Sequence, residues 1–287
     1  MSALFALDWA GGSVEAAFRR SRPGIDDLPW DRFCPDGLPP ALVDRARLAW
    51  TDGAFGEYAT AGQLAGLLEG LVRVRAPVDL IGAAGAFVAD EMVHVELHAR
   101  VLAALGGAAP YLVDDALLIA PIPVDEPPLR AVVAAAIRTC CVGEALSVAI
   151  LAASRKAVRD PLLVEVFSRI AADEVPHAQL GGWILDWAGP RLTDADRAAL
   201  SQVAAAAIAD VHALADTPSS TLAGGFTSEG FAVEDLRALG WIDSAAWATI
   251  ARTTLAERIL PRLQAAGLAL QGANTSRLTA PAATSAG

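Results

Sequence analysis

The chain has 287 residues, with 22 Lys and Arg against 33 Asp and Glu, and a formal net charge of −11. This acidic balance excludes a nucleic-acid binding surface, which would need basic patches to match phosphates. The three cysteines, two of them adjacent at Cys140 and Cys141, exclude a disulfide framework and a Cys-rich zinc or iron–sulfur site.

Hydrophobic residues make up 54% of the chain, and much of this fraction is Ala, the best helix former. We therefore expect an all-α protein with a large core. The longest apolar stretch, residues 131–153, contains Arg138 and Glu144, which predicts a buried core helix and no membrane partner. The first twenty residues lack the pattern of an export signal, so we expect a cytoplasmic location.

Residues 1–40 contain five prolines and several glycines, and this composition predicts an irregular N-terminal arm. A helical pattern follows over residues 42–74. Pro77 then stands in the first turn of a second helix, which ends at Gly106 and Gly107. Two helices joined by so short a loop should lie antiparallel.

Residues 108–128 carry five prolines and cannot be helical throughout, so they predict a long crossover. Beyond it, residues 129–158 and 161–188 form two further periodic segments, with Pro161 suited to a helix start. The expected plan is therefore a hairpin, a crossover and a second hairpin, as in bundles with one long connection.

Two more helical segments, residues 194–214 and 244–268, should cover one side of this bundle. The final residues are rich in Ala, Ser and Thr without periodicity, which predicts a disordered tail. The predicted divisions are an arm (1–40), a di-metal bundle (41–190), additional helices (191–270) and the tail (271–287).

Two Glu-x-x-His motifs occur, Glu91 with His94 and Glu174 with His177. Residues three apart share one face of a helix, so each motif directs a carboxylate and an imidazole to one point. One such motif alone has little specificity, because a solvated Glu beside a core His gives the same pattern.

Each motif is preceded by an isolated Glu in the partner helix, Glu57 before Glu91 by 34 residues and Glu144 before Glu174 by 30. With the short loop midway, antiparallel helices bring such residues level. Glu144 also lies in an almost wholly apolar stretch, and an ionised Glu is rarely buried there without a compensating charge. Four carboxylates would balance two divalent cations.

This pattern resembles the ferritin-like di-iron carboxylate superfamily over residues 42–188, which implies a ferritin-like four-helix bundle with one long crossover. The resemblance implies two iron ions, with manganese as a close competitor, and dioxygen as co-substrate. One ion would be held mainly by the first half of the pattern and the other by the second half, with some Glu bridging. The implied metal ligands are Glu57, Glu91, His94, Glu144, Glu174 and His177.

Asp90 and Asp173 each precede a motif glutamate, and in this superfamily a carboxylate there often orients a ligand histidine. A solvated Asp is the alternative. His98, one turn beyond His94, is either an additional ligand or pocket residue, or a core histidine, and the matching position in the fourth helix is Gly181.

Small or polar residues one turn from Glu57 or Glu144 are candidates for a pocket wall, although core positions are their ordinary place. These are Thr60, Cys140, Cys141 and Ser147. Gly181 is a further pocket candidate, because a small residue opposite His98 leaves room for a ligand or a substrate group.

The resemblance implies a di-iron oxidoreductase that hydroxylates or N-oxygenates a small organic substrate with dioxygen. Ferritin-like iron oxidation and sequestration is the alternative, and a scaffold protein that keeps the metals for stability is a third hypothesis. Because no flavin or iron–sulfur motif is present, electrons would come from the substrate, a small reductant or a separate donor. An oxygenase should be a monomer or homodimer, whereas a storage protein would form a cage.

Overall fold

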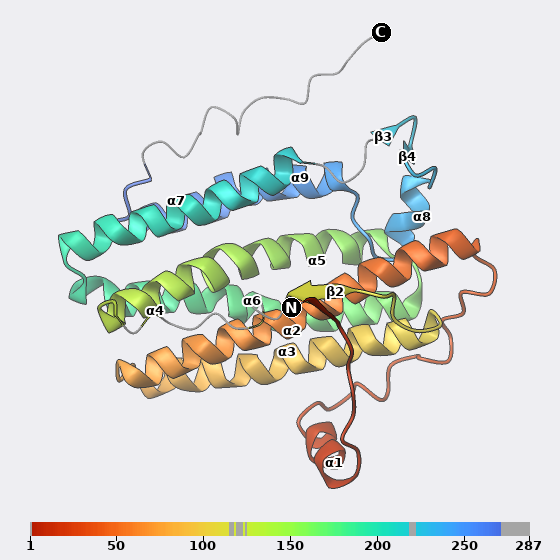
Figure 1. The fold of residues 1–287 in the computed structure, drawn as a ribbon, viewed down its shortest axis with the longest axis horizontal. Coiled ribbons are helices and arrows are strands. Elements are labelled where there is room, and N and C mark those ends of the chain that lie inside the picture. Colours follow the sequence, from red (N-terminus) through yellow and green to blue (C-terminus); the bar gives the residue numbers. More distant parts are fainter. Residues whose placement is uncertain (1, 115–117, 119–122, 124, 218–221, 271–287) are drawn as a thin grey trace.

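The structure is a computed structural model that describes residues 2–114, 118, 123, 125–217 and 222–270. Over these ranges the regular secondary structure is helical apart from two small antiparallel sheets. In these sheets β1 pairs with β2 and β3 with β4 (Figure 1). The predicted all-α fold class is confirmed.

In chain order, the elements are β1 (Ser2–Leu4), α1 (Gly12–Arg20), α2 (Pro40–Arg73), α3 (Val78–Ala104), β2 (Leu112–Asp114), α4 (Pro128–Ala136), the π-helix η2 (Ile137–Glu144), α5 (Ala145–Ala157), α6 (Pro161–Ala188), the 3-10 helix η3 (Gly189–Arg191), α7 (Asp194–Asp216), β3 (Leu222–Ala223), β4 (Phe226–Thr227), α8 (Val233–Ala238), α9 (Ser244–Thr254), the π-helix η4 (Leu255–Ile259) and α10 (Leu260–Ala265).

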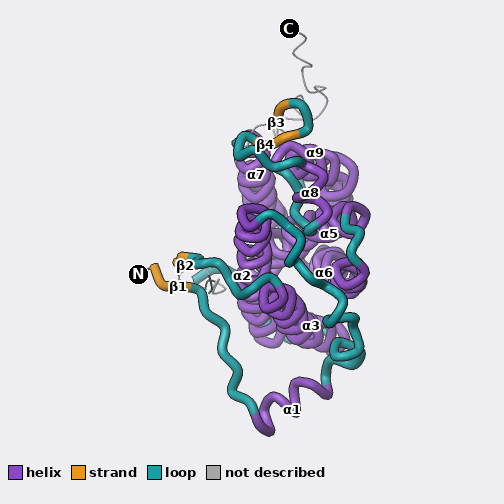
Figure 2. The backbone as a smooth tube through the Cα atoms, turned by 90° about the vertical axis from the view of Figure 1, so that its right-hand side faces the viewer, coloured by secondary structure: helices purple, strands orange, loops and turns teal. Residues whose placement is uncertain are grey.

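Four long helical segments lie side by side: α2, α3, the continuous α4–η2–α5 segment, and α6 (Figures 1 and 2). α2 packs along α3, and α6 packs along η2 and α5. Pro77 precedes α3 and Pro161 begins α6 as predicted, whereas Pro40 and Pro128, predicted in the arm and the crossover, begin α2 and α4. The carboxylate of Asp160 caps α6 by accepting a hydrogen bond from the Leu162 amide at 2.8 Å. Both hairpin loops are short, so the paired helices run antiparallel.

The buried apolar side chains form two clusters, one toward each end of the four long segments. On α2 one cluster ends at Ala54 and the other begins at Leu64, and on α6 the corresponding residues are Ile170 and Leu180. On these two helices Glu57, Glu174 and His177 occupy the interval between the clusters. The fold therefore surrounds a buried polar layer with apolar side chains on both sides.

The N-terminal arm contains more regular structure than predicted. Residues 12–20 form α1, and Ser2–Leu4 pairs with Leu112–Asp114 of the crossover. α1 lies beyond α3, on the side of the molecule away from α7 and α9 (Figures 1 and 2). Arg22, which follows α1, is buried against Glu96 of α3. The proline content of the arm gave no indication of this contact with α3.

The C-terminal helices α7 and α9 pack on the α4–η2–α5 segment, on one side of the four long segments (Figure 2). The short helix α8 and the β3–β4 hairpin were not predicted. The tail predicted to be disordered, residues 271–287, lies outside the described residues.

Two helical stretches, Pro128–Ala157 and Asp194–Asp216, are long and apolar enough to cross a membrane by length and composition. The core helix of a soluble protein meets the same criteria. Half of the most apolar window of the first stretch is buried inside the protein, and Arg138 and Glu144 interrupt it.

Candidate metal centre

All six residues predicted as metal ligands converge in the polar layer. Glu57 comes from α2, and Glu144 is the last residue of η2. The two motifs place their Glu and His on facing turns of α3 and α6. The side chains form two groups, within each of which the ligand atoms lie within 4.8 Å of one another. The groups are Glu57, Glu91, His94 and Glu174, and Glu91, Glu144, Glu174 and His177.

Glu91 and Glu174 belong to both groups, so the two sets of ligand atoms are adjacent and share two carboxylates. These buried Glu and His groups could hold metal ions. A carboxylate has two oxygens, and each oxygen can face a different ion. The arrangement therefore accommodates two neighbouring ions with Glu91 and Glu174 between them.

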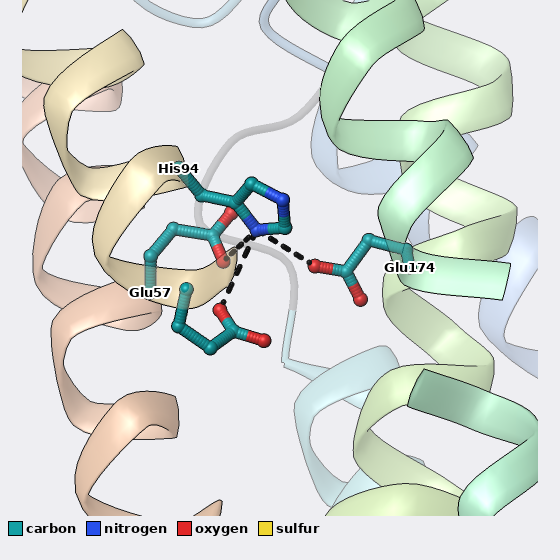
Figure 3. Close-up of side chains that lie close together, drawn as sticks. Glu57, His94 and Glu174 are labelled. Atoms are coloured by element: carbon teal, nitrogen blue, oxygen red, sulfur yellow. Dashed lines mark ion pairs between the residues drawn. The ribbon is translucent and has the colours of Figure 1, made fainter. Parts of the chain in front are cut away.

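In the first group, Nδ1 of His94 faces three carboxylates, and Glu174 approaches from the opposite helix (Figure 3). The Nδ1 atom lies 3.6 Å from Glu57 Oε2, 3.6 Å from Glu91 Oε2 and 3.3 Å from Glu174 Oε1. Ligand atoms at about 2.1 Å from one ion and at right angles stand roughly 3 Å apart. The distances between these ligand atoms are thus slightly longer than those in a closed coordination shell.

In the second group, Nδ1 of His177 lies 3.0 Å from Glu91 Oε1 and 3.8 Å from Glu174 Oε2. Each shared carboxylate therefore directs one oxygen toward His94 and the other toward His177. This is the orientation that a carboxylate takes when it bridges two ions.

The atoms that face the centre have no hydrogen-bond partner in the described part of the chain. They are both carboxylate oxygens of Glu91 and Glu174, Oε1 of Glu144, and Nδ1 of His94 and His177. Leaving one buried polar atom unpaired costs about 1–3 kcal/mol, and such atoms are rare in native proteins. A set of unpaired atoms that converge on two points fits bound cations, which would satisfy them.

Burial and crowding of like charges perturb the carboxyl groups of this site. Burial raises the pKa of Glu144 well above its ordinary value, and the nearby Glu174 and Glu91 raise it further. Burial also raises the pKa of Glu57, although His94 opposes this. For Glu91 burial has the same upward effect, but contacts with His177 and His94 lower its pKa overall.

The pKa values of the two imidazoles are also raised, although burial alone acts on them in the opposite direction to its effect on the acids. Burial lowers the pKa of His177, but Asp90 and Glu91 outweigh it and raise the pKa to about 9. His94 is likewise raised well above its ordinary pKa, against the effect of burial, by surrounding carboxylates. Without metal, protons therefore serve as the cations of this site, and metal ions would displace them.

Asp90 and Asp173 contact the outer ring nitrogens of the histidines, each across to the opposite helix. Nε2 of His177 lies 3.4 Å from Asp90 Oδ2, and Nε2 of His94 lies 3.5 Å from Asp173 Oδ2. Arg169 pairs with Asp173 at 3.1 Å. An aspartate at Nε2 favours the proton on that nitrogen and leaves Nδ1 to face the centre. These positions agree with the predicted orienting role.

The π-helix η2 is a feature that the sequence did not reveal. π-helices are rare and occur frequently at functional sites. Across from it, a Cβ at Gly181 would lie 2.5 Å from Cys141 Sγ and 2.9 Å from Cys140 Cβ, so α6 approaches η2 closely only because residue 181 has no side chain. Gly181 was predicted to leave room opposite His98, but the structure places it against η2 instead.

His98 belongs to neither ligand group among the described residues. Its Nδ1 lies 2.9 Å from the carbonyl oxygen of His94, and burial lowers its pKa. A Cβ at Gly53 would come within 2.7 Å of His98 Nε2, so the imidazole occupies space left by this glycine. His98 lines a cavity beside the metal centre, as one of its two predicted roles required.

This cavity has a volume of about 480 Å³ and reaches Glu57 and Glu144. Of the predicted pocket residues, Thr60 and Ser147 line it. Cys140 is fully buried in the core, and Cys141 faces a separate cavity near Arg262. The sequence did not predict the rest of the wall. It includes Phe167 of α6 and, from the C-terminal region, Trp241 and Trp247.

No protein-family model, curated protein or solved structure matches this chain. The site is therefore interpreted from its own geometry.

Proposed function

We propose that the chain is a ferritin-like di-iron carboxylate protein that uses dioxygen to oxidise a small organic molecule by hydroxylation or N-oxygenation. One observation carries this proposal: two buried ligand groups overlap through Glu91 and Glu174, and a cavity adjoins them at Glu57 and Glu144. A centre for metal storage or structural support needs the ligands but not the cavity. Manganese in one or both positions is the competing metal assignment.

Iron, when bound, supplies the reduction of dioxygen, and the protein supplies ligation, orientation and exclusion of water. Glu57 and His94 would hold one ion and Glu144 and His177 the other, with Glu91 and Glu174 available to both. The apolar clusters above and below the polar layer limit access from the two ends of the four long segments. Access is therefore through the cavity, whose opening includes exposed residues such as Asp52 and Gly56.

The aspartates keep the two imidazoles in one orientation. Asp90 accepts from Nε2–H of His177 at 3.4 Å, and Asp173 lies 3.5 Å from Nε2 of His94, so both aspartates favour the tautomer in which Nδ1 carries the lone pair that a metal needs. Arg169 compensates the charge of Asp173, whereas Asp90 lies nearer to solvent. We further propose that the electrons come from the substrate, a small reductant or a separate donor, and that the protein is a cytoplasmic monomer or homodimer.

The test is oxygen consumption by the full chain after anaerobic loading with Fe(II), measured with an oxygen electrode alongside iron content. Wild type should hold about two irons per chain and consume dioxygen when exposed to it. Glu174→Gln removes a shared carboxylate charge and should lose most of both signals. Glu165→Gln, an exposed position on the same helix, should retain them.

The outcomes separate the three hypotheses. Oxygen consumption by a monomer or dimer supports the proposal, and consumption that depends on a candidate organic substrate supports it further. A large cage on size-exclusion chromatography with continued iron uptake would favour ferritin-like iron oxidation and sequestration. Protein that retains metal but consumes no dioxygen would be a metal-stabilised scaffold.

A further inference from the structure

The cavity beside the candidate metal centre has a polar wall along α2. Asp52, Glu57 and Thr60 line it, Gly56 leaves open space, and the imidazole of His98 fills the space at Gly53. Glu57 and Thr60 are three residues apart and share one face of α2, whereas Asp52 is five residues from Glu57, about 140° around the helix, and stands at the exposed edge of the wall. The polar groups therefore extend from Asp52 at this edge to Glu57 at the candidate metal centre.

Aromatic rings form a second part of the wall. Trp50 and Phe167 are buried with their ring centroids 5.2 Å apart, and Trp241 and Trp247 add further ring surface. The indole N–H of Trp50 donates to the carbonyl of Leu239, so this ring is held in place. Such a surface favours a flat aromatic group of the ligand.

Several polar groups of the wall are hydrogen-bond acceptors, and a donor among them is the amide of Gln63, whose Oε1 accepts from Thr139 at 3.2 Å. His98 donates from Nδ1 to the carbonyl of His94, which leaves Nε2 as an acceptor in the neutral ring. Thr60 uses its hydroxyl proton on the carbonyl of Gly56, at 3.0 Å, and retains acceptor lone pairs. The Tyr111 hydroxyl donates to Asp52, which remains able to accept from a ligand. A ligand that donates hydrogen bonds matches this set.

The charge of the wall favours a cation. The residues that line the cavity in the described part of the chain include Asp52, Glu57 and Glu144 but no Lys or Arg. Two divalent ions would neutralise the four glutamates of the metal centre. The charge of Asp52, which lies outside the metal groups, would then be uncompensated within the cavity.

We propose that this cavity binds a primary amine that carries an aromatic ring, with its ammonium group at Asp52 and its ring against Trp50 and Phe167. The inference rests on the proposed function only in treating this amine as the substrate of the metal centre. Attraction to an exposed carboxylate and to aromatic faces gives about 1–2 kcal/mol together. An amine should thus bind about tenfold more tightly than an isosteric carboxylate, which Asp52 would repel.

The test compares 2-phenylethylamine with 3-phenylpropanoate and neutral 2-phenylethanol. Binding to the full chain, loaded with Mn(II) under nitrogen, is measured by titration calorimetry at pH 7 and low salt. Wild type should prefer the amine over the carboxylate about tenfold, with the alcohol between them. Added salt should reduce this preference, since Asp52 is exposed to solvent.

Three variants locate the origin of the preference. Asp52→Asn should bring the amine and carboxylate affinities to within about twofold of each other. Tyr111→Phe removes the hydrogen bond to Asp52 but keeps its charge, so the preference should remain. Glu69→Gln, an exposed acid farther along α2 whose partner is Arg73, should behave as wild type.

Equal or tighter binding of 3-phenylpropanoate, binding of no probe, or a preference unchanged in Asp52→Asn would overturn the inference. Iron content and oxygen consumption of the same preparations report separately on the proposed function. If the chain consumes dioxygen but prefers the carboxylate, only the substrate class is wrong. If the amine preference depends on Asp52 but no dioxygen is consumed, the binding site stands and the oxidase function fails.

Discussion

Two buried glutamates of this protein, Glu96 and Glu144, have opposite surroundings. Glu96 on α3 lies against Arg22 at 2.5 Å and Arg100 at 2.7 Å, and its side chain is 2% exposed. Glu144 at the end of η2 is equally buried, but its neighbours in the metal centre include Glu91 and Glu174. The protein compensates the first acid with its own arginines, whereas no ion pair with Arg or Lys is found for the second among the described residues, and the basic side chain in its group is His177.

The comparison shows how a structural acid differs from a ligand acid. Burial of a charge is costly unless it is paired, so Glu96 needs its arginines for folding. Glu144 has a strongly raised pKa because of burial and neighbouring carboxylates, which means that its ionised form opposes folding at neutral pH. The protein tolerates this cost at Glu144, where a bound metal cation would compensate the negative charge.

The largest expected effect is the loss of stability when Glu96 loses an arginine partner. Arg22→Ala should lower the free energy of unfolding by about 3 kcal/mol, since removing one partner of a buried ion pair leaves an uncompensated charge. Arg100 still contacts Glu96, so the loss should stay at the lower end of the usual range. Urea unfolding monitored by circular dichroism measures it. Arg19→Ala, an exposed neighbour on the arm, should leave the free energy of unfolding nearly unchanged.

A matched pair of substitutions sharpens the comparison directly. In metal-free protein at pH 7, Glu96→Gln should destabilise by about 2 kcal/mol. Glu144→Gln should leave the free energy of unfolding unchanged or raise it, because the unfavourable buried charge is gone. Thermal unfolding after removal of metal by a chelator tests both variants. Similar destabilisation by the two substitutions would show that Glu144, like Glu96, is compensated within the protein.

The smallest effect concerns the exposed edge of the arginine network. Arg100 and Arg22 lower the pKa of Asp26 to about 2 from its ordinary value of 3.8. For an acid with a lowered pKa in the folded state, the stabilisation is present above the ordinary pKa and is lost as the pH falls toward the folded-state value.

Asp26→Asn should therefore destabilise modestly at pH 6, by much less than Glu96→Gln because Asp26 is half exposed. The difference from wild type should vanish as the pH approaches about 2. Urea midpoints between pH 6 and pH 2 check this, and a constant difference over that range would contradict the assignment of the pKa shift to these ion pairs.

Much of the helical framework followed from the sequence because local signals fix it. Pro161 and Gly189 bracket α6, and the prediction of residues 161–188 agrees with the structure. The convergence of the two motifs with Glu57 and Glu144 could be expected for the same reason. In an antiparallel helical hairpin, residues at similar distances from the loop lie next to each other. Both depend on spacing within and between neighbouring helices.

Features that depend on distant segments could not be predicted. The cavity wall combines Trp50 with Trp241 and Trp247, which no periodic pattern connects. The partner of Glu96 is Arg22, 74 residues away in an arm whose prolines gave no sign of it. The π-helix η2 was missed because an inserted residue changes the helical period only locally, and Gly143 within it is a weak local signal.

The most direct test of the account is anomalous diffraction at the iron edge from crystals of the full chain loaded anaerobically with Fe(II). The account predicts two anomalous peaks inside the polar layer, with Glu91 and Glu174 adjoining both, one peak beside His94 and the other beside His177. Absence of a peak in this layer after Fe(II) loading, or iron bound only at surface acids, would contradict it.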